Sequence, residues 1–321
     1  MPIRAYRSFV RCVTLVMISM GVAFLTSCVR STPPSSNNNT STITATVQSS
    51  NNLTLLKQLL KKSKQDVRLN ISGPFTLFAP TDAAFASSGI DSLYINNLSD
   101  SALNALVLYH IIDSAIGTYY MPLGPNGKLI TSSGDSLFVT KRATGIFING
   151  IQITQPDVIA TNGFIDAMRF VLLPPKGNIL KVVQSDTSFS YLAAAIARAS
   201  NGSTEVTTLL TSAGPFSLLA PTNSAFQGAG YATMSDVNNA NPDSLARILT
   251  YHILIGRLFS SDLALGGSAN TVNGETVTFY PGTSISLSLQ GQKNSSVTNV
   301  TTANIMARNG VVHIIDRILL P

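Results

Sequence analysis

The amino-acid sequence predicts an α+β protein built from two similar domains, each a compact, mostly antiparallel β-sandwich or wedge with helices packed against it. Three observations support this prediction. The chain has 321 residues, which is enough for about two domains that each bury a core. Three motifs occur twice, in the same order. Within each copy, short apolar runs alternate with segments whose apolar residues follow helical spacing.

The repeat is the strongest signal in the chain. Residues 73–85 read GPFTLFAPTDAAF and return at residues 214–226 as GPFSLLAPTNSAF, with 9 of 13 positions identical. Two further motifs return in the same order: LVLYHII as ILTYHIL (residues 106–112 and 248–254) and NGFIDAMRFVLLP as NGVVHIIDRILLP (residues 162–174 and 309–321). A period of roughly 140 residues is too long for a solenoid unit. We therefore expect two whole domains, over residues 53–175 and 176–321.

The first motif predicts a strand followed by a short helix. Residues 75–79 are apolar, and Pro80 should end the strand because proline has no N–H for the ladder. Thr81 or Asp82 then caps the helix. The corresponding caps in the second copy are Thr222 and Asn223.

The second motif lies at the end of an amphipathic helix. Leu103, Leu106, Val107 and His110 fall at i, i+3, i+4 and i+7, and in the second copy the same spacing joins Leu245, Ile248, Leu249 and His252. Asn241 and Pro242 are typical of the start of that second helix. We expect both histidines on the buried face, where the ring donates to a neighbouring strand carbonyl. The adjacent Tyr109 and Tyr251 should turn away from them and be partly exposed.

Other segments complete the prediction for each domain. We expect short strands over residues 136–140, 145–148 and 274–280, and helices over residues 178–184 and 189–199. Residues 55–64 form a leucine-faced helix with four lysines. We expect that face to pack into the first domain, with a position on a membrane surface as the alternative.

The first 28 residues have the pattern of an export signal. Three arginines precede an apolar stretch over residues 12–25, which is shorter than the ~20 residues of a membrane-spanning helix. Two small residues then stand directly before Cys28, as in the lipobox of bacterial lipoproteins. The sequence predicts a signal peptide over residues 1–27 and lipid such as palmitate on Cys28. The alternatives are an ordinary signal with an incidental cysteine and an uncleaved anchor.

Residues 28–52 should combine this lipidated cysteine with a flexible tether, because residues 29–52 hold one charge and few large apolar groups. Val29 stands where an aspartate would favour inner-membrane retention in Gram-negative bacteria. We therefore expect an exported protein, anchored in the outer membrane through lipid on Cys28, on the cell surface or the periplasmic face.

Composition excludes several classes of function. The net charge is +6, but the basic residues form no patch suited to nucleic acid, so we expect no nucleic-acid partner. Two cysteines cannot build a disulfide framework or a four-cysteine zinc site. The three histidines are His110, His252 and His313, and none has an evident catalytic or metal-binding neighbour. No phosphate loop, dinucleotide fingerprint, nucleophile elbow or zinc-protease motif occurs. We expect no enzyme, no cofactor and no metal.

The three repeated motifs resemble the first conserved segment, the Tyr-His motif and the second conserved segment of the fasciclin (FAS1) domain. This resemblance extends over about residues 53–321. In animal members the Tyr-His region can serve adhesion, which makes Tyr109, His110, Tyr251 and His252 candidate binding or structural residues. His313 of the last motif is a further candidate. The first copy departs from the second in its last motif, because Asp166 replaces His313 and Arg169 replaces Asp316.

Together with the predicted export signal and lipidated Cys28, the resemblance leads us to expect an envelope-anchored adhesion or binding lipoprotein with an extracellular protein, matrix component or glycan as its ligand. The main alternative is an accessory binding lipoprotein of a glycan-uptake or envelope-assembly system. A hydrolase whose site the sequence does not reveal is a more distant one.

Overall fold

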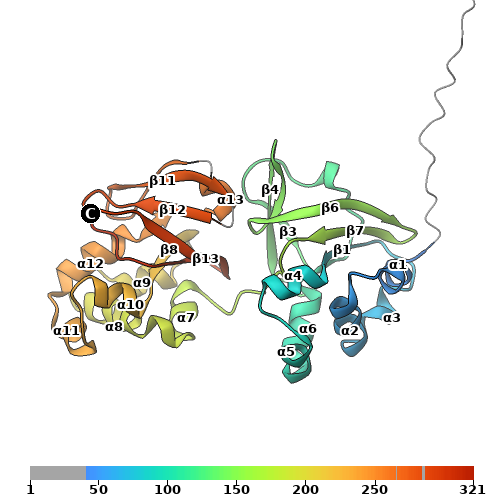
Figure 1. Cartoon of the computed structure of the whole chain (residues 1–321), viewed down its shortest axis with the longest axis horizontal. Helices are drawn as coiled ribbons and strands as arrows, with labels where there is room; N and C mark the ends of the chain where they lie inside the picture. The colour runs from blue at the N-terminus through green and yellow to red at the C-terminus, as the bar shows by residue number, and fades with distance from the viewer. Residues whose placement is uncertain (1–40, 265, 284–285) are drawn as a thin grey trace, which may run out of the picture. The chain divides into compact units, whose positions relative to one another are not determined.

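The computed structural model describes residues 41–264, 266–283 and 286–321, in which each sequence repeat forms its own seven-stranded sheet with helices packed on it (Figure 1). In each sheet one neighbouring pair is parallel and the others are antiparallel. The predicted α+β class with two mostly antiparallel domains is confirmed. The predicted signal peptide, Cys28 and residues 29–40 of the tether lie outside the described residues.

The first sheet has the strand order β2-β1-β7-β6-β5-β4-β3. Its strands are β1 (Phe75–Pro80), β2 (Ile111–Ile112), β3 (Gly127–Ile130), β4 (Ser136–Arg142), β5 (Gly145–Ile148), β6 (Ile151–Ala160) and β7 (Gly163–Met168). Strands β1 and β7, which come from the first and last motifs of the repeat, form the parallel pair, with Leu77 opposite Ile165. Every residue of β1 is buried, as expected for a strand covered on both faces.

The first domain also contains short helices on the chain before and between its strands (Figure 1). They are α1 (Ile43–Ser49), α2 (Thr54–Lys62), α3 (Gln65–Arg68), α4 (Asp82–Ser87), α5 (Ser92–Asn97), α6 (Asp100–Leu108) and the single 3₁₀ turn η1 (Thr118–Tyr120). The predicted leucine face of α2 packs inward as expected, because Leu56, Leu59 and Leu60 are buried in the core of this domain.

The second domain repeats this arrangement with the strand order β10-β11-β12-β13-β14-β8-β9. Its strands are β8 (Phe216–Pro221), β9 (Ile253–Ile255), β10 (Gly267–Asn270), β11 (Thr276–Thr283), β12 (Ser286–Gln290), β13 (Thr298–Ala307) and β14 (Gly310–Ile315). Its helices are α7 (Ile179–Gln184), η2 (Thr187–Phe189), α8 (Ser190–Ala199), α9 (Val206–Thr211), α10 (Asn223–Gly228), α11 (Met234–Asn239), α12 (Pro242–Tyr251) and α13 (Ser260–Leu263). The parallel pair is again the first and last strand, with Leu218 opposite Val312.

Each sheet separates two large apolar clusters of its domain. Successive side chains of a strand point to opposite faces, and in β1 Leu77 lies in the cluster beneath the helices whereas Phe78 lies in a second cluster. That second cluster is formed mainly by the strands of the sheet itself, so the sheet encloses a core of its own. In the second domain, Leu218 and Leu219 are divided in the same way.

The caps of the first motif settle which of the two candidate residues starts each helix. The Thr81 side chain accepts the N–H of Ala84 at 3.2 Å and caps α4, and Thr222 caps α10 in the same way. Asp82 instead accepts the N–H groups of Thr54 and Leu55, which have no acceptor within α2 because they lie in its first turn. Thr81 and Asp82 of this motif therefore bind the starts of both α4 and α2. Pro80 is the last residue of its strand.

The first domain begins earlier than the sequence suggested, and this corrects the expected tether over residues 28–52. Residues 43–49 form α1, whose Ile43 and Val47 lie one turn apart and are fully buried. The helix occupies the place that α7 has in the second domain, since Ile43 N donates to Asn162 and Ile179 N donates to Asn309. Two apolar residues are enough to hold this polar segment as a helix because they pack into a core that the rest of the domain already forms.

The Asn-Gly pair that opens the last motif holds three segments together. The Asn162 side chain accepts from Ile43 N at 2.9 Å and donates to the carbonyls of Leu69 and Ile71, both at 2.8 Å. Gly163 has a positive φ, and a Cβ there would lie 1.8 Å from the Phe75 carbonyl oxygen. Only glycine lets the two parallel strands start this close together. In the second domain Asn309 makes the corresponding three contacts, and a Cβ on Gly310 would lie 2.1 Å from the Phe216 carbonyl oxygen.

Candidate functional site

The two histidines of the Tyr-His motifs bind backbone groups at both ring nitrogens. His110 Nδ1 lies 2.8 Å from the carbonyl oxygen of Leu106, and its Nε2 accepts the N–H of Leu172 at 3.0 Å. In the second domain, His252 contacts the Ile248 carbonyl at 2.8 Å and accepts the N–H of Leu319 at 2.9 Å. Because Nε2 is the acceptor, Nδ1 carries the proton and donates to the carbonyl. Each ring therefore links the end of its helix to the segment that follows the last strand.

This arrangement corrects one detail of the sequence prediction. We expected the histidines to donate to a strand carbonyl, but each donates to a carbonyl one turn earlier in its own helix. The link to the rest of the domain is made by the acceptor nitrogen. Burial lowers the pKa of His110 and of His252 to about 4, so both rings are neutral near pH 7.

The neighbouring tyrosines are buried, contrary to the expected partial exposure. Tyr109 and Tyr251 have no exposed surface and lie in the strand-enclosed cluster of their domains, among side chains from several strands of the sheet. The Tyr109 hydroxyl donates to the carbonyl of Ser136 at 3.0 Å and accepts from Asn149 Nδ2 at 2.9 Å. Burial raises the pKa of Tyr109 above its ordinary value. These side chains stabilise the core through buried hydrogen bonds and present no surface to a partner in this fold.

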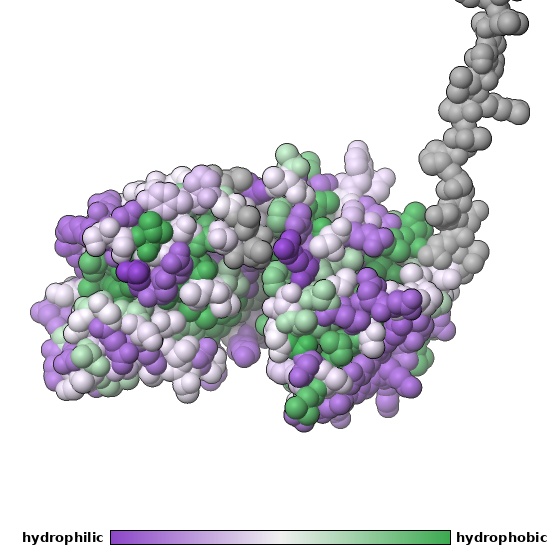
Figure 2. All heavy atoms as spheres, viewed as in Figure 1, coloured by the Kyte–Doolittle hydropathy of each residue, from purple (hydrophilic) through white to green (hydrophobic). Residues whose placement is uncertain are grey.

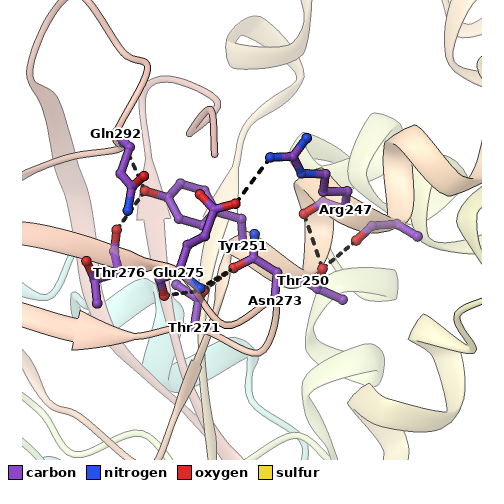
Figure 3. Close-up of polar contacts among 9 residues, drawn as sticks. Arg247, Thr250, Tyr251, Thr271, Asn273, Glu275, Thr276 and Gln292 are labelled. Atoms are coloured by element: carbon purple, nitrogen blue, oxygen red, sulfur yellow. Dashed lines mark hydrogen bonds and ion pairs between the residues drawn. The ribbon is translucent and has the colours of Figure 1, made fainter.

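Figure 3 shows the corresponding tyrosine hydrogen bonds in the second domain. The Tyr251 hydroxyl donates to the Thr276 carbonyl at 2.8 Å and accepts the N–H of Gln292 at 3.0 Å. Beside it, Arg247 of α12 forms an ion pair with Glu275 at 3.2 Å. Both charged groups are solvent-accessible, so this pair contributes little to stability. Most polar groups drawn around Tyr251 bind one another, whereas the buried Nδ2 of Asn273 has no hydrogen-bond partner.

The last motif differs between the two copies, as the sequence predicted. His313 Nε2 lies 2.9 Å from the Leu258 carbonyl and its Nδ1 faces the N–H of Asn304, and burial lowers its pKa to about 4. In the first domain Asp166 accepts the N–H of Asp157 at 2.8 Å through Oδ1, while its buried Oδ2 has no partner. Burial raises the pKa of Asp166 to about 7. Asp166 and His313 thus occupy corresponding positions in the two domains but form different hydrogen bonds.

One surface feature was missed by the sequence reasoning. The η1 turn exposes two consecutive aromatic side chains, with Tyr119 82% and Tyr120 80% accessible. Their ring centroids lie 5.1 Å apart and the ring planes are nearly perpendicular, at 89°. The available signal was a Tyr-Tyr pair between a glycine and a proline, in a chain with nine tyrosines.

Metal and membrane signals are weak in the part of the chain that the structure describes. No group of three or more histidine, cysteine or acidic side chains there could hold a metal ion. No helix among those residues is both long and apolar enough to cross a bilayer.

The fold and the motif geometry define a tandem pair of domains whose polar motif residues maintain the structure. The family model for the fasciclin domain matches residues 51–174 and again residues 188–321. The chain therefore belongs to the fasciclin domain family, in agreement with the resemblance found in the sequence.

Several proteins of known sequence are similar to most or part of the chain. It is 29% identical to transforming growth factor-beta-induced protein ig-h3 of Sus scrofa over 82% of its length, and 29% identical to periostin of Homo sapiens over 81%. It spans 37% and 30% of those two proteins. Protein sll1483 of Synechocystis sp. is 32% identical over 44% of this chain and 73% of its own. A solved FAS1 domain pair of the insect cell adhesion molecule fasciclin I covers 84% of this chain and 97% of that one, with 18% identity and a TM-score of 0.41.

Proposed function

We propose that the chain is a non-catalytic binding protein that mediates adhesion by attaching the cell envelope to an extracellular ligand. Two fasciclin domains in one chain support the proposal, because a second contact surface on the same chain, even an unequal one, raises avidity when both engage. The observation that carries it is a contrast within the first domain. The motif residues Tyr109 and His110 are buried, whereas Tyr119 and Tyr120 are held out to solvent.

The rest of the visible surface is compatible with contact to a large, weakly charged ligand. Only 11% of all residues are charged, and on the face seen in Figure 2 hydrophilic and hydrophobic residues are interspersed. An interface is distinguished from the remaining surface less by overall hydrophobicity than by aromatic residues at its centre. An exposed tyrosine pair is such a centre.

The proposal includes the anchor predicted from the sequence. The mature chain begins at a lipidated Cys28 and is held in the outer membrane, with both domains outside the cytoplasm. Growth with a labelled fatty acid tests this: the wild type should carry label and sediment with membranes, and a Cys28→Ala protein should do neither. Label on the Cys28→Ala chain would contradict the anchor while leaving the binding proposal standing.

Binding is tested with the full mature chain immobilised on a sensor and exposed to separate solutions of collagen, fibronectin, laminin and neutral polysaccharides. We expect saturable binding to at least one of them, and reduced adhesion of cells from which the gene is deleted. Two results together would contradict the proposal: the folded chain binds none of these ligands, and cells from which the gene is deleted adhere as well as the wild type. Hydrolysis of any glycan by the purified chain would replace it with the enzymatic alternative.

A further inference from the structure

The exposed tyrosines lie in a loop that the fold holds in place. The η1 turn is bounded by Thr118 and Met121, which are both buried, so the loop is fixed at each end. Tyr119, Tyr120 and Leu123 point outward and are all about four-fifths exposed. Large apolar and aromatic groups gathered at one place on a surface mark an interaction site.

Two charged side chains hold the backbone of this loop. The Asp157 carboxylate accepts the N–H of Thr118 at 2.7 Å and also binds the Thr118 hydroxyl. The Lys141 ammonium donates to the carbonyls of Thr118 and Tyr119, at 2.9 and 3.1 Å, and lies 6.0 Å from the centre of the Tyr119 ring. A ligand that contacts the tyrosines therefore meets a loop that is already ordered, so little backbone entropy is lost on binding.

The second domain shows which part of this arrangement the fold requires. There the N–H of Ser260 donates to Asn304 Oδ1 at 2.8 Å, and Asn304 Nδ2 donates to the Ser260 hydroxyl. Asp157 and Asn304 also share a positive φ at an irregularity in β6 and β13. The support is thus common to both domains. The tyrosines are not, because Ser261 and Asp262 follow Ser260.

The chemistry of the loop indicates the class of ligand. The charges in contact with it, on Asp157 and Lys141, have opposite signs and both bind the loop itself, which does not favour a strongly charged partner. The tyrosine side chains are about four-fifths exposed and line neither the hollow beside Leu172 nor the one beside Leu53, so they protrude from the surface. A protruding, neutral, aromatic surface suits a ligand with an extended apolar face edged by hydroxyl groups. The pyranose rings of a polysaccharide have such faces, and a tyrosine can stack on one while its own hydroxyl forms hydrogen bonds.

We propose that Tyr119 and Tyr120 form a stacking platform for a neutral polysaccharide chain, with Leu123 extending its apolar contact. This inference rests on the proposed binding function and names the residues and the ligand class for it. The platform belongs to the first domain alone, so the two fasciclin domains are not equivalent binding units.

The test uses the full mature chain in native gels that contain glucomannan, xyloglucan, mixed-linkage glucan or amylose. We expect at least one polysaccharide to retard the wild type. A Tyr119→Ala/Tyr120→Ala variant should bind that polysaccharide about tenfold or more weakly, and a Tyr119→Phe/Tyr120→Phe variant should keep most of the binding because the rings remain. The chain has no tryptophan, so changes in tyrosine emission can follow the titration directly.

The matched control is Tyr94→Ala, which removes another exposed tyrosine, 46% accessible, from α5. Its binding should equal that of the wild type. Lack of retardation of the folded wild type in all four gels would overturn the platform, as would equal binding by the double alanine variant or equal loss in the Tyr94 control. Tyrosine-dependent sedimentation with vesicles of phosphatidylethanolamine and phosphatidylglycerol, without polysaccharide binding, would also overturn it in favour of membrane contact. If the double variant still binds a matrix protein as the wild type does, the binding function survives and only the sugar platform fails.

Discussion

The Nε2 atom of His252 accepts the backbone N–H of Leu319 at 2.9 Å, which ties the end of α12 to the segment after β14. The same bond joins His110 to Leu172 in the first domain. Each domain is thus closed by one buried, neutral ring that bridges a helix carbonyl and a distant backbone amide. The histidine of the Tyr-His motif therefore has a sufficient physical role within the fold.

Replacing His252 with alanine should loosen the second domain. The change leaves the buried N–H of Leu319 without a partner and opens a cavity, for a combined loss of about 2–4 kcal/mol of unfolding free energy. Hydrogen exchange followed by mass spectrometry should show faster exchange around Leu319 and β14, while peptides of the first domain serve as the internal control. Unchanged protection around Leu319 would contradict the bridge.

The three histidines should make the fold sensitive to mild acid. Burial lowers the pKa of His110, His252 and His313 to about 4, whereas the usual value is 6.5. Between those values the unfolded chain binds protons that the folded chain does not, so the free energy of unfolding falls as the pH drops from 6.5 to 4. Urea unfolding at several pH values should show this decline. A flat profile between pH 4 and 6.5 would show that the rings are not neutral in the fold.

Asp166 should act in the opposite direction. Its pKa is raised by burial to about 7 from 3.8, so the folded chain holds a proton that the unfolded chain has lost, and stability falls as the pH rises through this range. An Asp166→Asn variant keeps an oxygen that can accept the N–H of Asp157 and has no charge to bury. Its gain in stability over the wild type should be largest at pH 8, smaller at pH 5 and close to zero below about pH 4, where the unfolded chain is protonated as well. Asp100→Asn, at an exposed carboxylate in the first turn of α6, is the matched control and should change stability by less than about 0.5 kcal/mol at any of these pH values.

Helix α1 should be part of the folded first domain. Ile43→Ala removes a fully buried side chain and should cost about 2–4 kcal/mol, whereas Gln48→Ala on the exposed side of the same helix should change stability by less than about 0.5 kcal/mol. Thermal unfolding by circular dichroism compares the two. Equal stability of both variants would mean that residues 43–49 behave as part of a tether.

The predictions from sequence succeeded where the cause is local. The caps at Thr222 and Asn241 follow from side chains that reach an N–H three positions ahead, and the buried face of α6 follows from helical spacing. The tyrosine positions could not be predicted this way. Whether Tyr109 faces water depends on how β3, β4 and β5 close over the helix end, which no local pattern records.

Helix α1 shows a different cause of failure. Its segment has too few apolar residues to predict order by itself, and Ile43 and Val47 are held because α2, β7 and the Asn162 side chain surround them. The repeat contained the missing information, since the second domain opens with the corresponding helix α7. Comparing the two copies beyond their shared motifs would have moved the boundary of the first domain to include it.

The sequence by itself determined that the chain has two copies of one α+β domain, where their main helices and strands begin, and to which family they belong, because repeated motifs and short-range spacing carry that information. The tertiary structure decided which motif residues reach solvent. Burial is set by contacts between segments far apart in the chain. Tyr109 and Tyr251 are therefore hydrogen-bonded core residues, Asp166 is a buried carboxyl group with one oxygen unpaired, and Tyr119 and Tyr120 form the exposed aromatic surface.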